Sequence, residues 1–392
     1  MMSQRVCNTV MPSGSFEVNT VNGFNDHSRD TVPNEIINIP VVVHIVYKTS
    51  AQNITDAEVL SQIAVLNQDF RLKAAGVLNI PLAFKGFAAD ARINFCLAQV
   101  DPTGHTTKGI VRKYTNNDYF LDDAIKFSAQ GGDNAWDSKK YLNIWVCYLF
   151  GRSLGYSSIP GGPADKDGVV ITTDVFGTIA PLRTPFDKGR TATHEIGHWL
   201  GLKHLWGDED CGSDDVDDTP SQRFSNYYCP AFPHVTTCSP NANGDMFMNF
   251  MDFTDDACMS MFTQGQKAKM RGLFALNGPR NSFLNSFACD SSLATGGPLP
   301  SDTTINEVKP TAADEINIYP NPAREIINIR AKNILTLKGK TAKLVTITGK
   351  LVKRQTLLSN VERIDVSQLL PGIYFLKIGE GNTSKVFKII KL

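Results

Sequence analysis

The sequence predicts an α+β fold: a twisted mixed sheet with a histidine-bearing helix in residues 36–290, then a small all-β sandwich in residues 314–392. Strand-like and helix-like segments alternate in the first part, whereas the second contains only short alternating strands separated by Gly, Pro and Asn. Residues 291–313 between them are rich in Ser, Thr, Pro and Gly, the composition of a linker. With 392 residues the chain is long enough for two or three domains.

The first 35 residues are polar and rich in Asn, Ser, Asp and Thr, with no sustained period of 2 or 3.6 residues. Such a composition cannot bury enough apolar surface to form a core of its own. We therefore expect residues 1–35 to be a separate N-terminal segment, which contains Cys7.

The sheet is predicted to begin at residues 37–47, which are mostly β-branched and apolar. Apolar residues recur at helical spacing over residues 54–70. His44 lies inside the first strand, so we expect a hydrogen-bonded core residue and not a metal ligand. A helix near residues 190–200 packs on the sheet, whose further strands are predicted near residues 93–98, 141–149 and 168–172.

Three of the 7 histidines lie close together on and just after this helix. His194 and His198 are four residues apart, so on a helix both rings can reach one metal ion. Gly201 can adopt a left-handed backbone, end the helix and turn the chain so that His204 reaches the same ion. Three imidazole nitrogens leave one position of a zinc ion open, which is typical of a catalytic zinc site.

Glu195 lies beside these ligands, where its carboxylate can take a proton from a zinc-bound water as a general base. This arrangement predicts hydrolysis of peptide bonds, with Glu195 returning the proton to the leaving amine. Two alternatives stay open. A secreted adhesin could keep the fold without turnover, and a structural zinc protein would need a fourth protein ligand, which only Cys7 could supply.

The histidine motif matches the long zinc signature of metzincin metalloproteases, and Met251 within residues 249–253 matches their methionine turn. Together with residues 141–147 and 217–220, these motifs resemble the pappalysin family over about residues 36–290, in particular its ulilysin-like or cytophagalysin-like branch. The resemblance implies a metzincin-type catalytic domain and a secreted zinc endopeptidase acting on proteins or peptides.

The resemblance also implies that Met251 forms a hydrophobic floor under the zinc ligands, although a simple core position predicts the same burial. Relatives usually carry Tyr two residues later, where this chain has Phe253. Because phenylalanine cannot donate a hydrogen bond, no mechanism for this chain should depend on a phenol there.

In this family, an N-terminal Arg-x-Cys-Gly-like propeptide blocks the open zinc position with its thiolate. Arg5-Val6-Cys7-Asn8 is similar, with Asn8 in place of glycine. Cys7 is therefore either a latency ligand or an unpaired terminal cysteine. The resemblance further implies that Asp256 lines the pocket for the residue after the cut and favours Lys or Arg, although Asp256 and the adjacent Asp255 could both be solvated.

Carboxylates are concentrated between Asp208 and Thr219. A solvated acidic loop is the ordinary interpretation, but hard oxygen ligands so close together suit calcium. Since relatives bind calcium in this region, we expect a structural calcium site formed by Asp214, Asp217 and Thr219.

The chain contains 8 cysteines, which indicates an oxidising compartment. Cys96 and Cys147 fall inside apolar strand-like runs, where we expect free buried thiols. Four others lie in the loop-rich stretch after the zinc helix. The resemblance implies that these four form the disulfides Cys211–Cys238 and Cys229–Cys258.

Residues 314–392 resemble the C-terminal sorting domain of the type IX secretion pathway, through the motifs at residues 317–322 and 370–374 and the basic, apolar end at 385–392. The resemblance implies a secreted or cell-surface protein with the secretion machinery as partner; a carbohydrate-binding or adhesive sandwich is the alternative. Basic and acidic residues are equal at 39 each, so no overall charge favours nucleic acid. No apolar run is long enough to span a membrane.

Overall fold

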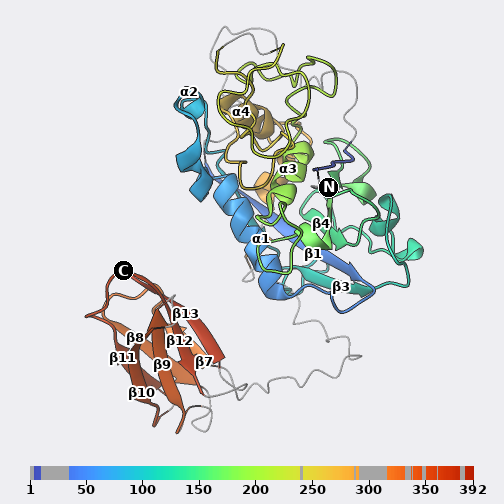
Figure 1. Ribbon diagram of the computed structural model, residues 1–392. Helices are drawn as coiled ribbons and strands as arrows, with labels where there is room; N and C mark the ends of the chain where they lie inside the picture. The colour runs from blue at the N-terminus through green and yellow to red at the C-terminus, as the bar shows by residue number, and fades with distance from the viewer. Residues whose placement is uncertain are drawn as a thin grey trace. The chain divides into compact units, whose positions relative to one another are not determined.

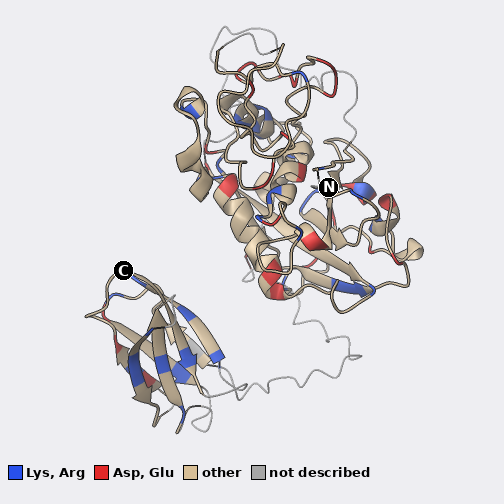
Figure 2. Cartoon of the chain, viewed as in Figure 1, with Lys and Arg blue, Asp and Glu red and all other residues tan. Residues whose placement is uncertain are grey.

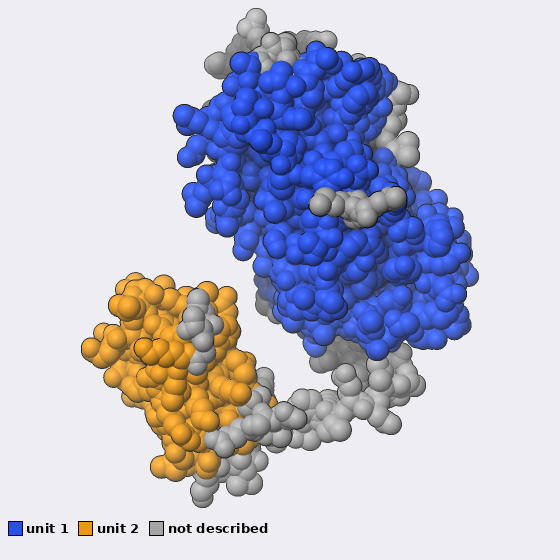
Figure 3. Space-filling model, viewed as in Figure 1, with its two compact units in different colours: residues 1–300 blue, residues 301–392 orange. Residues whose placement is uncertain are grey.

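The computed structural model describes residues 4–9, 35–238, 242–286, 288–290, 316–331, 337, 339–346, 350–359, 361–379 and 385–392. The chain divides into two compact units, residues 1–300 and 301–392 (Figure 3). The linker predicted at residues 291–313 lies outside the described residues.

The first unit is built on a mixed sheet around β1 (Ile37–Tyr47), as predicted (Figure 1). The strand order is β2-β1-β4-β6-β5, and β3 also pairs with β1. The pairings of β1 with β2, β3 and β4, and of β4 with β6, are parallel, whereas β5 pairs with β6 in antiparallel fashion. The sheet therefore ends at β5, whose outer edge can hydrogen-bond a further strand. The other strands are β2 (Ile93–Leu97), β3 (Ile110–Tyr114), β4 (Leu142–Cys147), β5 (Gly155–Ser157) and β6 (Val169–Thr172).

Helices pack against this sheet, and two of the α-helices start at a local side-chain cap. Thr55 and Glu58 form a capping box at the start of α1, as do Thr263 and Gln266 at the start of α4. The α-helices are α1 (Asp56–Asp69), α2 (Leu82–Lys85), α3 (Arg190–Trp199) and α4 (Gln264–Gly272). Short 3-10 helices are η1 (Ala75–Asn79), η2 (Asp123–Lys126), η3 (Ser128–Gln130), η4 (Ala164–Lys166), η5 (Thr173–Val175) and η6 (Asn281–Asn285).

Both faces of β1 are buried, which explains its continuous apolar run. Ile39, Val41, Val43 and Ile45 belong to the main core, together with residues of α1, α3 and α4. His44 is fully buried, as expected of a core histidine. Its Nδ1 lies 2.7 Å from the Asp133 carboxylate, and its Nε2 lies 3.0 Å from Asn143 Oδ1.

The prediction of a free thiol at Cys96 is wrong, because Cys96 forms a disulfide with Cys289. Cys96 is only half-buried on β2. The chain near Cys289 lies beside the end of this strand, where Gln99 N donates a hydrogen bond to Ala288 O at 2.6 Å. This contact brings together two cysteines that are 193 residues apart in the sequence. Cys147 is free and buried, as expected.

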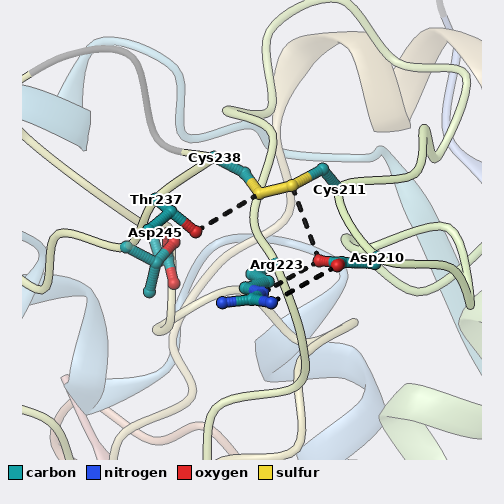
Figure 4. Close-up of a disulfide and its surroundings, with 7 residues drawn as sticks. Asp210, Cys211, Arg223, Thr237, Cys238 and Asp245 are labelled. Carbon is teal, nitrogen blue, oxygen red and sulfur yellow. Dashed lines mark hydrogen bonds and ion pairs between the residues drawn. A yellow bond between two sulfur atoms is a disulfide. The ribbon is translucent and has the colours of Figure 1, made fainter.

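Two further disulfides hold the loops that follow α3. They join Cys211 to Cys238 and Cys229 to Cys258, the pairing that the resemblance implied. Beside the first of them, Arg223 forms an ion pair with Asp210 at 3.0 Å (Figure 4).

The second unit is all β, as predicted. Its two antiparallel sheets, β10-β9-β12-β13 and β11-β8-β7, share one core. Residues 316–392 carry 14 Lys and Arg against 4 Asp and Glu, and Figure 2 shows basic residues recurring on the strands. Although basic and acidic residues are equal in number over the whole chain, the C-terminal domain is therefore strongly basic. The strands are β7 (Ile316–Tyr319), β8 (Ile326–Ala331), β9 (Thr341–Thr346), β10 (Leu351–Thr356), β11 (Val361–Asp365), β12 (Gly372–Ile378) and β13 (Lys385–Lys391).

Candidate active site

Helix α3 and the turn after it bring the three predicted metal ligands together. His194 and His198 lie one turn apart with ring centroids 4.7 Å from each other. Gly201 has a φ of +81°, the left-handed conformation predicted for it, and the chain then returns to place His204 beside them. His198 Nε2 lies 3.1 Å from both His194 Nε2 and His204 Nε2.

The opposite nitrogen of each ring shows which atoms could bind a metal. The Nδ1 atom of His194 lies 2.7 Å from Phe250 O, and that of His198 lies 2.8 Å from Leu202 O. The Nδ1 atom of His204 lies 2.5 Å from an Asp208 carboxylate oxygen. These oxygens accept hydrogen bonds, so each Nδ1 carries the proton and the three Nε2 lone pairs face one another. Lone pairs this close repel unless a cation lies between them. The donor set therefore fits one zinc ion held by three Nε2 atoms.

Burial keeps the rings of His194 and His198 neutral. It lowers the pKa of His198 to about 3, and it lowers the pKa of His194 well below its ordinary value, with the neighbouring imidazoles adding to the effect. Neutral imidazole is the form that binds metal.

The methionine turn lies directly against the zinc helix. Met251 is fully buried, and a Cβ built on Gly197 would be 2.4 Å from its sulfur, so the two segments meet with no room for a side chain at Gly197. Phe253 follows, with its ring centroid 4.9 Å from that of His204. Phe253 therefore contributes packing and no hydrogen bond to the histidine site.

Glu195 is buried between the zinc helix and the edge strand β5. A Cβ on Gly155 of β5 would be 3.1 Å from Glu195 Cγ, so the carboxylate lies against this strand. Glu195 Oε2 accepts a hydrogen bond from Thr9 Oγ1 at 2.9 Å and one from Cys7 Sγ at 3.4 Å. Burial raises the pKa of Glu195 to about 7, although these two hydrogen bonds act to lower it.

Residues 4–9 add to the edge of β5. Leu154 N donates to Val6 O at 3.0 Å, and Asn8 N donates to Gly155 O at 3.2 Å. This pairing places Cys7 Sγ and one ring nitrogen from each of the three histidines within 4.8 Å of one another. The sequence left the reach of Cys7 open, and the structure brings its thiol to the side of the three Nε2 atoms. Burial raises the pKa of this thiol well above its ordinary value, and the Glu195 charge adds to the effect, so a thiolate there requires a nearby cation.

The side chain of Arg5, two residues before Cys7, is buried at a place that we call the Asp256 pocket. Its guanidinium forms an ion pair with the buried Asp256 at 2.5 Å, hydrogen-bonds Thr191 Oγ1 at 3.1 Å and lies 5.0 Å from the ring centroid of Phe186. The other Asp256 oxygen accepts from the backbone N of Lys188 at 2.8 Å, just before α3.

Asp256 was predicted from the sequence to be a site residue, whereas four further site residues were not: Arg5, Thr9, Thr191 and Phe186. The Arg in the Arg-x-Cys motif was the available signal for Arg5. Asp255, the alternative to Asp256, is only half-buried.

Comparisons with known proteins agree with this geometry. Residues 126–275 match the family described as pregnancy-associated plasma protein-A. An extracellular metalloprotease of Verticillium alfalfae is 32% identical over 249 residues, which are 61% of this chain and 76% of that protein. The chain belongs to the pregnancy-associated plasma protein-A family, the pappalysins.

Solved structures agree with the assignment to the pappalysins. Mature mirolysin of Tannerella forsythia, in complex with a cleaved peptide, is 48% identical with a TM-score of 0.65 and covers 67% of this chain and 100% of its own. A promirolysin variant from the same organism is also 48% identical, with a TM-score of 0.65, and covers 69% of this chain and 89% of its own. This pappalysin therefore has a metzincin fold and is a secreted zinc endopeptidase. The inert adhesin is not favoured.

The C-terminal unit of this pappalysin is a sorting domain. Residues 317–392 match the secretion system C-terminal sorting domain, which indicates secretion through the type IX pathway. Among the described residues, none of the helices has the length and apolar character that crossing a bilayer requires.

The residues expected to bind calcium lie in the loop after the zinc helix. Asp214 is buried, and Thr219 Oγ1 lies 2.8 Å and 2.9 Å from its two carboxylate oxygens. Asp217 is exposed. The structure thus brings Asp214 and Thr219 together, and calcium at this place stays a prediction.

Proposed function

We propose that His194, His198 and His204 hold the catalytic zinc through Nε2 and that Glu195 is the general base of a metzincin-type endopeptidase. The observation that carries this proposal is the convergence of three unprotonated Nε2 atoms beside a buried carboxylate. When bound there, zinc supplies a Lewis acid that activates water and polarises the scissile carbonyl.

The remaining roles in catalysis and substrate binding belong to groups around the zinc site. Glu195 takes the proton of the attacking water and passes it to the leaving amine. In the structure Glu195 Oε2 accepts from Thr9 and Cys7, both in the N-terminal segment, so removal of that segment frees this oxygen. The edge of β5, which now pairs with Val6 and Asn8, becomes free to bind substrate backbone.

A metal-depletion experiment tests the proposal. The activated enzyme should lose casein hydrolysis when zinc is removed with a chelator. One equivalent of zinc should restore it, because the part of the chain that the structure describes forms a single three-histidine site. Hydrolysis that persists in demonstrably zinc-free protein would contradict the proposal.

We also propose that Cys7 is the ligand that keeps the full chain latent. Its sulfur lies within 4.8 Å of a ring nitrogen of each histidine, and its segment pairs with the β5 edge. Residues 1–35 then act as a propeptide.

Asp256 should select a basic residue immediately after the scissile bond. The proposal rests on Arg5, whose guanidinium shows that the pocket accepts a cation of this shape and pairs it with Asp256. Leaving a buried charge unpaired costs about 3–5 kcal/mol, so Asp256→Asn should lower kcat/KM for Arg substrates by roughly 100-fold or more. Cleavage of peptides that differ only at this position measures the effect.

The matched control is Asp255→Asn, which changes the half-buried neighbour. Asparagine at position 256 retains an oxygen for the backbone N of Lys188, so α3 should stay in place. A basic preference that survives in Asp256→Asn would rule out this role for Asp256.

We propose in addition a structural calcium ion at Asp214, Asp217 and Thr219. Burial raises the pKa of Asp214 to about 7, against about 3.9 for an unfolded chain. Because the folded pKa is the higher one, protonation favours the fold at low pH, and ionisation costs stability as pH rises towards about 7. Calcium binding to the ionised carboxylate would offset that cost.

Calcium should therefore raise the melting temperature more at about pH 8 than at about pH 6, since protons compete for Asp214 at the lower value. Thermal melts in calcium-containing and calcium-free buffer measure the difference, and Asp214→Asn should abolish it. A midpoint that does not respond to calcium at either pH removes the site.

A further inference from the structure

A cavity of about 600 Å³ opens beside the edge strand β5. Its lining comes from residues 121–130, from the end of β5 and from residues 157–166. Asn8 of the N-terminal segment also lines it, and this residue is hydrogen-bonded to Gly155 of β5. The cavity is therefore continuous with the edge where the N-terminal segment is bound.

The direction of the N-terminal segment places this cavity relative to the scissile bond. Arg5 precedes Cys7 and enters the Asp256 pocket, whereas Asn8 follows Cys7 and lines the cavity. Since residues 6–8 are extended along β5, the Asp256 pocket and the cavity lie on opposite sides of Cys7. If the Asp256 pocket receives the residue after the cut, the cavity faces residues before the cut.

Four charged residues line the cavity, and the two carboxylates of Asp122 and Asp123 balance the two ammonium groups of Lys126 and Lys166 in formal charge. Asp123 pairs with Lys126 at 2.9 Å and with Lys166 at 3.2 Å. Lys126 also lies 5.1 Å from the Tyr156 ring centroid, and Lys166 lies 5.9 Å from that of Phe127. Both ammonium groups are thus engaged within the wall.

Apolar side chains supply the rest of the binding surface. The cavity is lined by Leu121, Phe127, Tyr156 and Ile159, and Leu121 is 65% exposed at this site. Apolar and aromatic groups that line a cavity beside a peptide-binding edge favour burial of an apolar partner over a charged one.

We propose that this cavity is a substrate subsite for an aromatic or large aliphatic side chain two or three residues before the scissile bond. The inference rests on the proposed function of the histidine site and on the Asp256 pocket. Asn8 is too small to fill a cavity of this volume, so a larger substrate side chain would bury apolar surface that the N-terminal segment leaves open.

Quenched fluorescent peptides test the proposal. They share Arg after the scissile bond and carry Ala, Phe, Leu, Asp or Lys at the second or third position before it. The activated enzyme should cleave the Phe and Leu peptides with kcat/KM about tenfold above the Ala peptide at one of these positions. The Asp and Lys peptides should be no better than Ala.

Phe127→Ala should bring the Phe-to-Ala ratio of kcat/KM down to about one. Leu121→Ala should lower the same ratio. It is the alternative variant if Phe127→Ala does not fold, because Leu121 is exposed. Phe224→Ala is the matched control, because Phe224 is exposed and lies outside the cavity.

The outcomes separate the two proposals. If none of these peptides is cut, the proposed function itself fails, and this inference with it. If the Ala peptide is cut but neither position prefers Phe or Leu, or the preference survives both Phe127→Ala and Leu121→Ala, the cavity is not the proposed subsite.

Discussion

Replacing Glu195 with alanine should lower kcat for protein hydrolysis by about 1,000-fold, within the range that a general base contributes. The carboxylate lies beside the three histidines without being one of the converging ligands, so the zinc content should stay at one ion per chain. Initial rates on casein, with metal analysis of the same sample, measure both quantities.

The matched control for this substitution is Glu209→Ala, which removes an exposed carboxylate in the turn after His204. It should leave both turnover and metal content unchanged. If Glu195→Ala retained turnover on casein, Glu195 could not be the base, and the water would have to be activated by another group.

Replacing Cys7 with alanine should activate the full chain without proteolytic processing. A ligand tethered in the same chain has an effective concentration in the millimolar range, so loss of the thiolate should raise the initial rate by about 100-fold or more. Removal of residues 1–35 should have at least the same effect, because it also withdraws Arg5 from Asp256 and frees the β5 edge. Peptide hydrolysis by freshly purified protein measures the change.

Cys147→Ala is the control for this second experiment, since Cys147 is the other free cysteine found among the described residues and is buried in the sheet. It should leave the chain latent. Equal rates for the native chain and Cys7→Ala, together with activation on removal of residues 1–35, would mean that the segment blocks the site without Cys7 as a zinc ligand.

The parts of the fold and site that were predictable from sequence depend on local spacing. The four-residue spacing of His194 and His198 places both side chains on one face of a helix. The left-handed backbone of Gly201 was expected because only glycine adopts that conformation at low cost. Strand β1 was recognisable because burial on both faces requires a continuous apolar run. These features need no knowledge of distant residues.

The features that could not be predicted from the sequence depend on tertiary contacts. Arg5 and Asp256 are 251 residues apart, and Thr9 reaches Glu195 across 186 residues. Neither pair has a local pattern that would signal the contact. Cys96 was misread for the same reason: its apolar neighbours indicated burial, but its partner Cys289 arrives beside β2 only through the path of the chain after η6.

X-ray absorption at the zinc edge, recorded before and after removal of residues 1–35, would identify the zinc ligands in the full chain and in the activated form. We expect three nitrogen ligands at about 2.0–2.1 Å in both forms, with a sulfur at about 2.3 Å in the full chain that is replaced by oxygen in the activated form. A spectrum of the activated form that shows four protein ligands, or fewer than three nitrogens, would contradict a catalytic zinc held by His194, His198 and His204.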